Sequence, residues 1–148
     1  MTTYDPTGHD VSAGYDITAA VTVTVYVFPA PPGPSGAVGA GPPADPALDA
    51  MFHRTVQVIT RRVGVGPATE EPFVLADGTS RLFGRQARFE YRQFGTGMSS
   101  LFYLLRHGDF FLKFRVTFAR AADKYATDRL AELMKDFKWP PVRGAKAP

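Results

Sequence analysis

The chain has 148 residues, of which 45% are apolar and none is cysteine, and its formal net charge is +3. This length and apolar content favour one domain with its own core, and the absence of cysteine excludes disulfides, thiol catalysis and thiolate metal sites. Because the excess of basic residues is small, charge by itself does not indicate a nucleic-acid partner.

The sequence carries no signal for a membrane-spanning or secretory segment. No apolar run reaches the roughly eighteen residues that a membrane-spanning helix needs. Residues 1–16 lack the basic and apolar regions of a signal peptide. We therefore expect a soluble chain, located in the cytoplasm or, as a processed form, in the cell envelope, and the sequence leaves both compartments open.

Residues 17–28 predict a β-strand, because apolar and semi-polar side chains alternate along them with the period of a strand. One face carries Ile17, Ala19, Val21, Val23, Val25 and Val27. The other face carries Thr18, Ala20, Thr22, Thr24, Tyr26 and Phe28. This second face suits either solvent or a binding surface.

A stretch rich in proline and glycine follows this strand at residues 29–46, PAPPGPSGAVGAGPPADP. A linker between two domains is excluded, because the residues before it hold a single strand and cannot form a core. A phosphate-binding loop is disfavoured, because the stretch contains no lysine. We interpret residues 29–44 as a surface insertion within one domain that spans residues 1–148.

A helix is predicted to begin directly after this insertion. Asp45 is a typical N-cap residue, and Pro46 suits the first helical position because its missing N–H leaves no bond unmade. Apolar residues then recur at helical spacing up to Val63, and Gly64 stands where helices commonly end.

Two strands are predicted next. Residues 73–75 form a short strand before an Asp77-Gly78 turn, and residues 82–94 form a longer one. In the longer strand, Ala87, Phe89 and Tyr91 share one face, whereas Arg88, Glu90 and Arg92 share the other. The glycines of residues 95–100 (GTGMSS) predict a turn after it.

The last part of the chain predicts a hairpin and a helix. Residues 101–106 and 110–118 read as two antiparallel strands. Their second strand places Phe110, Leu112, Phe114, Val116 and Phe118 on one side. An amphipathic helix is predicted over residues 123–137, and residues 142–148 are predicted to form a frayed tail.

No motif for catalysis, cofactor binding or metal binding is present. His9, His53 and His107 are not paired at a metal-ligand spacing. Ser99 and Ser100 follow glycines but lack the G-x-S-x-G pattern of a nucleophile elbow. The sequence therefore predicts no catalytic, cofactor-binding or metal-ligating residue and favours a protein that is not an enzyme.

One constellation is a candidate binding surface, the polar face of the predicted sheet. If the strands pair as expected, this face brings together Thr22, Thr24, Tyr26, Arg88, Arg92, Lys113 and Arg115. Its guanidinium and ammonium donors suit an anion or an acidic partner, with Tyr26 and Phe111 as apolar anchors. The alternative is a solvated face on which Arg88, Glu90 and Arg92 compensate one another.

The second half of the chain resembles the PsbP/DcrB-like group. The stretch GDFFLKFRVTFAR and a terminal helix that ends in DFKWP carry this resemblance, over residues 80–140. The group includes small bacterial lipoproteins, photosystem accessory proteins and type VI secretion chaperones. The resemblance implies an antiparallel sheet with helices on both faces, and a role as a non-catalytic binder or assembly factor.

The predicted fold is α+β. We expect an antiparallel sheet of about five or six strands with two helices packed on one or both faces, in the order β-α-β-β-β-β-α. The leading functional hypothesis is a non-enzymatic accessory or binding module that presents a sheet face or the proline- and glycine-rich loop to a macromolecule, with another protein as the favoured partner. The sequence does not indicate an oligomeric state.

Two other functional classes remain as alternatives. The first is a small-ligand-binding protein or enzyme with a pocket between the aromatic-rich sheet and a helix. The second is nucleic-acid binding, which is disfavoured because stacking requires exposed aromatic rings, whereas Phe110, Phe114 and Phe118 fall on the predicted core side.

Overall fold

The computed structural model describes residues 11–18, 21–33, 44–62, 64–77 and 80–136. The strands are β1 (Val11–Thr18), β2 (Val21–Pro29), β3 (Thr69–Asp77), β4 (Ser80–Gln93), β5 (Thr96–His107) and β6 (Phe110–Ala119). The helices are α1 (Pro46–Thr60) and α2 (Asp123–Asp136), and a 3-10 turn over Arg120–Ala122 precedes α2. Most of the predicted insertion and the predicted tail at residues 142–148 lie outside the described residues.

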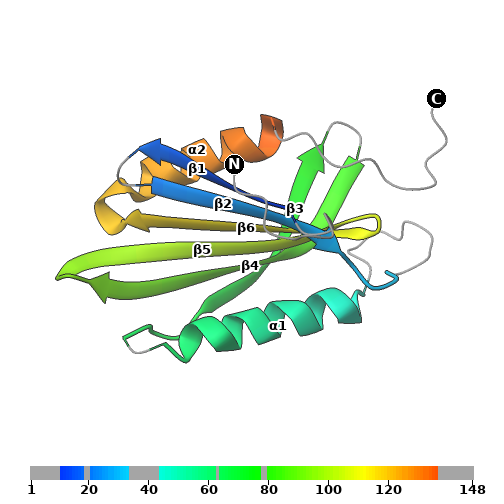
Figure 1. Cartoon of the computed structure of the whole chain (residues 1–148), viewed down its shortest axis with the longest axis horizontal. Helices are drawn as coiled ribbons and strands as arrows, with labels where there is room; N and C mark the ends of the chain where they lie inside the picture. Colours follow the sequence, from blue (N-terminus) through cyan, green and yellow to red (C-terminus); the bar gives the residue numbers. More distant parts are fainter. Residues whose placement is uncertain (1–10, 19–20, 34–43, 63, 78–79, 137–148) are drawn as a thin grey trace.

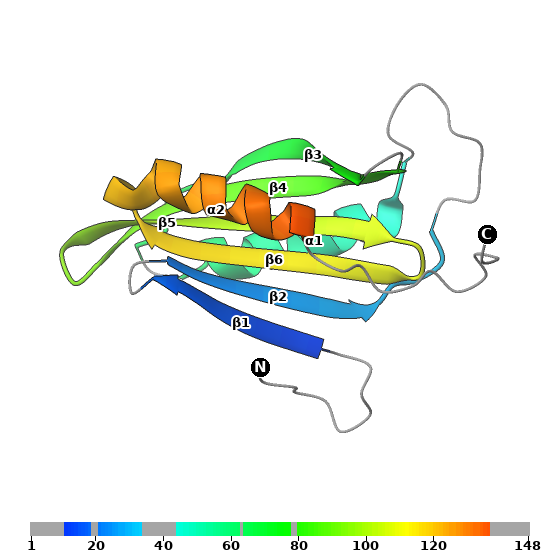
Figure 2. The ribbon, with the colours of Figure 1, turned by 90° about the horizontal axis from the view of Figure 1, so that it is seen from above.

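The described strands form one antiparallel sheet in the order β1-β2-β6-β5-β4-β3, and α1 and α2 pack on its opposite faces (Figures 1 and 2). The predicted α+β class and element order are confirmed, with one strand added at the start. The sequence pattern gave a single strand at residues 17–28, whereas Thr18 pairs with Val21 in a hairpin. The alternation runs through residues 17–28 without a glycine or proline, so it did not reveal that two strands share this stretch.

Two strand boundaries also differ from the prediction. β3 is longer than residues 73–75, because the acidic and proline residues 70–72 belong to it. It lies at an edge of the sheet, where charged residues and proline are tolerated because one row of backbone groups needs no strand partner. The turn predicted at residues 95–100 is instead a two-residue turn at Phe94 and Gly95, since Gln93 pairs with Thr96.

Both faces of the sheet carry a hydrophobic core. Against Ala126, Leu130 and Met134 of α2, the sheet buries Val21, Val23, Val25, Leu101, Leu105, Leu112, Phe114, Val116 and Phe118. Against Leu48, Phe52, Val56 and Ile59 of α1, it buries Ala87, Phe89, Phe102, Leu104 and Phe111. Phe111 was predicted to be an apolar anchor on the polar face of the sheet, but it is only 1% exposed because it lies in this second core, edge-on to Phe28.

The position of α1 decides which part of the sheet stays open. Asp45 caps the helix as predicted, because its carboxylate accepts a hydrogen bond from the Leu48 N–H at 3.1 Å. From this start α1 packs along β4 and β5 (Figure 1). The core against α1 includes Phe111 of β6 and reaches Phe28 of β2, and the outward side chains further along these two strands form the surface considered next.

Candidate functional site

The uncovered part of the α1 side gathers residues of β2 and β6. Tyr26 lies directly opposite Lys113, and Thr24 lies directly opposite Arg115. Side chains opposite each other in an antiparallel pair project to the same side of the sheet. We call the surface formed by Thr22, Thr24, Tyr26, Lys113 and Arg115 the basic face.

Lys113 is a partly buried cation of the basic face. Its ammonium lies 4.3 Å from the centroid of the Tyr26 ring, a cation–π contact. Burial lowers the pKa of Lys113, and the positive charge of Arg115 lowers it further. The ammonium is therefore held in an environment that does not fully replace its hydration.

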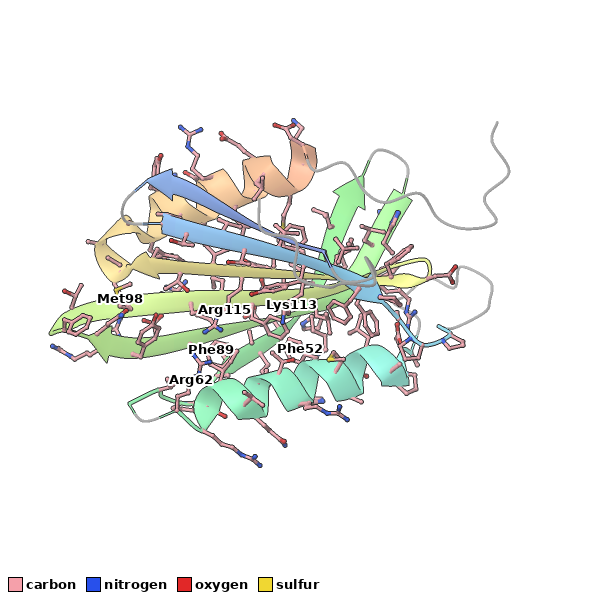
Figure 3. The ribbon with its side chains drawn as sticks, viewed as in Figure 1. Phe52, Arg62, Phe89, Met98, Lys113 and Arg115 are labelled. Carbon is pink, nitrogen blue, oxygen red and sulfur yellow. The ribbon has the colours of Figure 1, made fainter. Side chains whose placement is uncertain are left out.

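Arg115 lies beside Lys113 on β6. Figure 3 shows both side chains on the side of the sheet that carries Phe89 and faces Phe52 of α1. The Arg115 Nε donates a long hydrogen bond of 3.5 Å to the Ser100 hydroxyl. Among the side chains that the structure describes, neither Lys113 nor Arg115 forms an ion pair with a carboxylate.

Two arginines that were predicted on this surface lie on the other side of the sheet. Arg88 pairs with Leu101, whose side chain lies in the α2-side core, whereas Arg115 pairs with Phe102 of the α1-side core. Arg92 follows Arg88 at strand periodicity and shares its side. The prediction of one shared face is therefore wrong for Arg88 and Arg92. It placed the apolar residues of β4 and β6 in one core, whereas Ala87 and Phe89 lie in the α1-side core and Phe114 and Val116 lie in the α2-side core.

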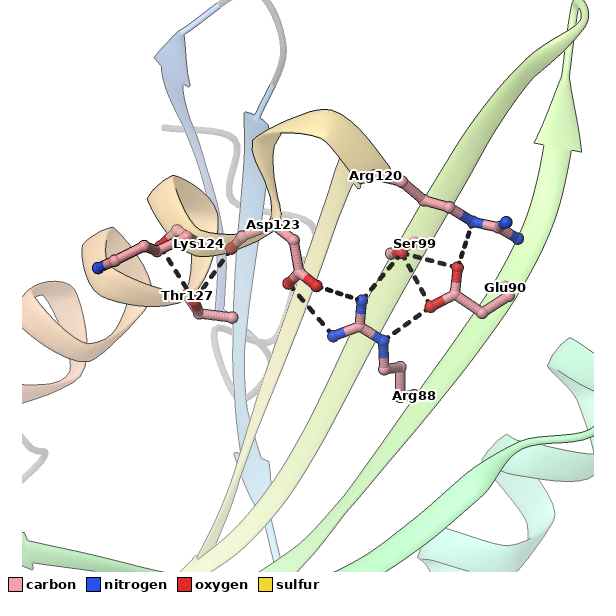
Figure 4. Close-up of polar contacts among 7 residues, drawn as sticks. All are labelled: Arg88, Glu90, Ser99, Arg120, Asp123, Lys124 and Thr127. Atoms are coloured by element: carbon pink, nitrogen blue, oxygen red, sulfur yellow. Dashed lines mark hydrogen bonds and ion pairs between the residues drawn. The ribbon is translucent and has the colours of Figure 1, made fainter.

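Arg88 is the centre of a polar network at the start of α2 (Figure 4). Its guanidinium donates to both carboxylate oxygens of Asp123, at 2.7 and 3.2 Å, and its Nε donates to Glu90 at 2.7 Å. The buried Ser99 hydroxyl donates to the same Glu90, at 2.9 Å, and Arg120 adds a further bond to it at 2.6 Å. The sequence could not place Asp123 in this network, because that contact is made only when α2 folds back over the sheet.

The hydrogen bonds of this network favour the charged forms of Glu90 and Arg88. Partial burial opposes ionisation of Glu90, but hydrogen bonds from Arg88 and Ser99 outweigh it and hold the pKa of Glu90 below its usual value. The hydrogen bonds to Asp123 raise the pKa of the Arg88 guanidinium above its usual value. Through these bonds Arg88 anchors the start of α2 to β4 and β5.

A cavity of about 660 Å³ lies beside the N-terminal end of α1. It is bounded by the first turn of α1, by β4 and by the turn between β5 and β6. Its apolar lining comes from Leu48, Pro72, Leu82 and Phe83, and its charged lining from Asp45, Asp49, Arg81, Arg85, Arg106 and Asp109. Two pairs of these charges neutralise each other, because Asp45 pairs with Arg106 and Asp49 with Arg85.

Metal binding and membrane crossing were also considered for the described part of the chain. No group of three histidine, aspartate or glutamate side chains there is arranged to hold a metal ion. His53 approaches Glu70 at 3.6 Å on the exposed side of α1. Neither described helix is long and apolar enough to cross a bilayer.

Comparisons with known proteins show a similar fold and indicate no activity. No family model matches the sequence. No curated protein matches it either. Among solved structures, the chain is similar to PA94 of Pseudomonas aeruginosa, a protein of unknown function described as a candidate regulator, with a TM-score of 0.53 and 8% identity over 90% of this chain and 84% of that one. At this identity the likeness shows a shared fold alone.

Proposed function

We propose that the protein is a non-enzymatic accessory module that uses its basic face to bind an acidic segment of a partner protein. One observation carries this proposal: Lys113 and Arg115 are half-buried side by side, and the side chains described around them supply no carboxylate. Buried charges in proteins are ordinarily paired, so a carboxylate from a partner is the natural counter-charge.

The neighbours of the two cations fit the same purpose. Tyr26 offers an aromatic surface next to Lys113, and Thr22 and Thr24 place further polar groups along β2. Aromatic and arginine side chains together are typical of the residues that dominate protein interfaces. A partner carboxylate would favour the charged form of Lys113 and raise its pKa, so the affinity should fall as the pH rises through the pKa of this ammonium.

The resemblance to the PsbP/DcrB-like group supports an accessory role, and we include membership of that group in the proposal. Members of the group are mostly non-catalytic binders or assembly factors. The stretch that carries the resemblance, GDFFLKFRVTFAR, contains both Lys113 and Arg115. The two cations of the basic face thus belong to the part of the chain on which the resemblance rests.

The double variant Lys113→Glu/Arg115→Glu should lose the acidic partner. We expect its affinity to fall by about tenfold or more, because two attractive charge pairs become repulsive. The partner would be captured with tagged wild-type protein from a lysate of the source cells, identified by mass spectrometry, and then titrated against each variant.

The matched control is Arg129→Glu/Lys135→Glu, which makes the same change in net charge on exposed positions of α2, at the opposite face. Circular dichroism and melting curves would confirm that both variants are folded. A partner that binds the Lys113/Arg115 variant as tightly as it binds the α2 control would contradict the proposal.

The cavity at the start of α1 supports a second candidate, the binding of a small molecule. Its volume of about 660 Å³ lies within the range of known small-molecule sites, and Leu48 and Phe83 provide apolar contact area. A ligand of this site should raise the melting temperature progressively with its concentration. A metabolite screen that finds no such compound would exclude this candidate in favour of the basic face.

A further inference from the structure

The turn between β4 and β5 contains a phenylalanine whose backbone conformation and solvent exposure are both unusual. Phe94 has a φ of 49° and its side chain is 99% exposed. Gly95 follows with a φ of 79°, and Gln93 pairs with Thr96 across the turn. Two central residues with positive φ define the tightest common type of hairpin turn, whose usual residues are asparagine and glycine.

Phe94 is unfavourable for the isolated fold in two respects. A bulky side chain in the left-handed region strains the backbone, whereas asparagine at the same place would not. The ring is also left almost wholly in water, and no other side chain of the described chain shields it. Strain that folding does not require is a reason to look for a role outside the fold.

The surroundings of Phe94 are amphipathic. On the α1 side of the hairpin, Tyr91 pairs with Met98, so an apolar pair lies just behind the tip (Figure 3). On the other side, Arg92 is exposed and donates to the Gly95 carbonyl at 3.4 Å, and Arg120 is half-exposed. The nearest acidic residue along β4, Glu90, is already engaged by Arg88 and Arg120.

The tip projects from one end of the molecule. Figures 1 and 2, which differ by a rotation of 90°, both show the β4–β5 turn extending beyond the two helices. A protein partner would need a shaped pocket to receive a convex tip of this kind. The interface of a bilayer can accept a convex tip without a preformed pocket. Aromatic rings insert at the boundary between headgroups and acyl chains, while arginines reach the lipid phosphates.

We propose that this hairpin tip is a peripheral attachment site for an anionic lipid surface, with Phe94 inserted at the interface and Arg92 at the headgroups. The charge of the tip selects the lipid class, because arginines near a bilayer surface are attracted by anionic headgroups and the attraction is weakened by salt. This site is separate from the basic face, and each is tested by its own variants.

Sedimentation with vesicles tests the proposal. Wild-type protein should bind vesicles of phosphatidylcholine and phosphatidylserine, bind phosphatidylcholine alone more weakly, and be released as salt is added. Phe94→Asn should bind the anionic vesicles about tenfold more weakly, because it removes most of the apolar area that enters the interface. Its melting temperature should equal or exceed that of wild type, since asparagine relieves the strained turn.

Val58→Asn is the matched control, because Val58 is another exposed apolar residue but lies on α1. A second measurement follows insertion directly: the fluorescence of Phe94→Trp should shift to the blue with anionic vesicles, whereas that of Val58→Trp should not. Equal vesicle binding by wild type and Phe94→Asn would overturn the proposal. A wild-type protein that does not bind anionic vesicles would also overturn it. If Phe94→Asn in that case failed to bind a protein that wild type captures, the tip would be a protein-binding site.

Discussion

Replacing Gly84 with alanine should lower the free energy of unfolding by about 3 kcal/mol or more. A Cβ atom at this position would lie 2.0 Å from the Leu104 carbonyl oxygen and 2.8 Å from the Leu105 Cδ2. The first of these neighbours is backbone, so the clash cannot be relieved by rotating a side chain. β4 and β5 would have to separate, and this pair of strands lies beneath α1.

Urea unfolding curves of wild type, Gly84→Ala and Gly66→Ala test this expectation. Gly66→Ala is a suitable control, because a Cβ there meets its nearest neighbour, the Glu90 carbonyl oxygen, at an ordinary 3.7 Å. We expect the control to change the unfolding free energy by less than about 1 kcal/mol. Equal midpoints for the two variants would show that β4 and β5 have room to adjust at Gly84.

Gly84 also illustrates what the sequence could predict. The alternation along residues 82–94 predicted β4, because period two is a local property of the chain. The helices followed from local signals as well, since Asp45 and Pro46 mark the start of α1 at the observed place. The close approach of Gly84 to Leu104 leaves no such signal, because it depends on how two strands twist against each other.

The exact pairing of β4 with β5, and the division of apolar residues between two cores, could not be predicted from local patterns. The glycines of residues 95–100 indicated a turn there, whereas the turn falls on Phe94 and Gly95. Phenylalanine is disfavoured at positive φ, so turn chemistry argued against the true position. The face of Arg88 and Arg92 depended on something else, which is that the sheet has a core on each side. Because Ala87 and Phe89 belong to the α1-side core, Arg88 and Arg92 lie on the α2 side, opposite Lys113 and Arg115.

The pairing of β2 with β6 was simpler to anticipate. Both strands alternate strictly, so Tyr26, Lys113 and Arg115 had to share a face once the strands were neighbours. What the sequence could not show is how far α1 spreads across that face. Phe111 is covered in the α1-side core and Lys113, two residues further on, is only partly buried. That boundary is set by the docking of α1, a long-range contact.

The ion pair between Asp45 and Arg106 gives the second large expected effect. Arg106 donates to both carboxylate oxygens of Asp45 and to the Pro31 carbonyl at 2.8 Å, and its guanidinium lies 4.7 Å from the centroid of the Phe111 ring. The side chains of both Asp45 and Arg106 are only 12% exposed. The Arg106 guanidinium therefore connects Pro31, just after β2, to Asp45, the N-cap residue of α1.

Arg106→Ala should lower the free energy of unfolding by about 3 kcal/mol at neutral pH, because it leaves the Asp45 carboxylate largely buried without its partner. Urea unfolding measures this change. Arg129→Ala removes an exposed ion pair with Glu132 and should change the unfolding free energy by no more than about 1 kcal/mol, which makes it the matched control.

The dependence of this loss on pH separates the charge of Arg106 from its packing. Burial opposes ionisation of Asp45, but hydrogen bonds from Arg106 and the Leu48 N–H outweigh it and hold the pKa of Asp45 below the ordinary value of 3.8. A carboxyl group with a lowered pKa stabilises the fold above its ordinary pKa, and this stabilisation is lost as the pH falls through the lower, folded value. The difference between wild type and Arg106→Ala should therefore narrow below pH 3.8, because Asp45 becomes protonated. A difference that stays constant on acidification would instead mean that Arg106 stabilises the protein through its contact with Phe111, since that contact does not titrate.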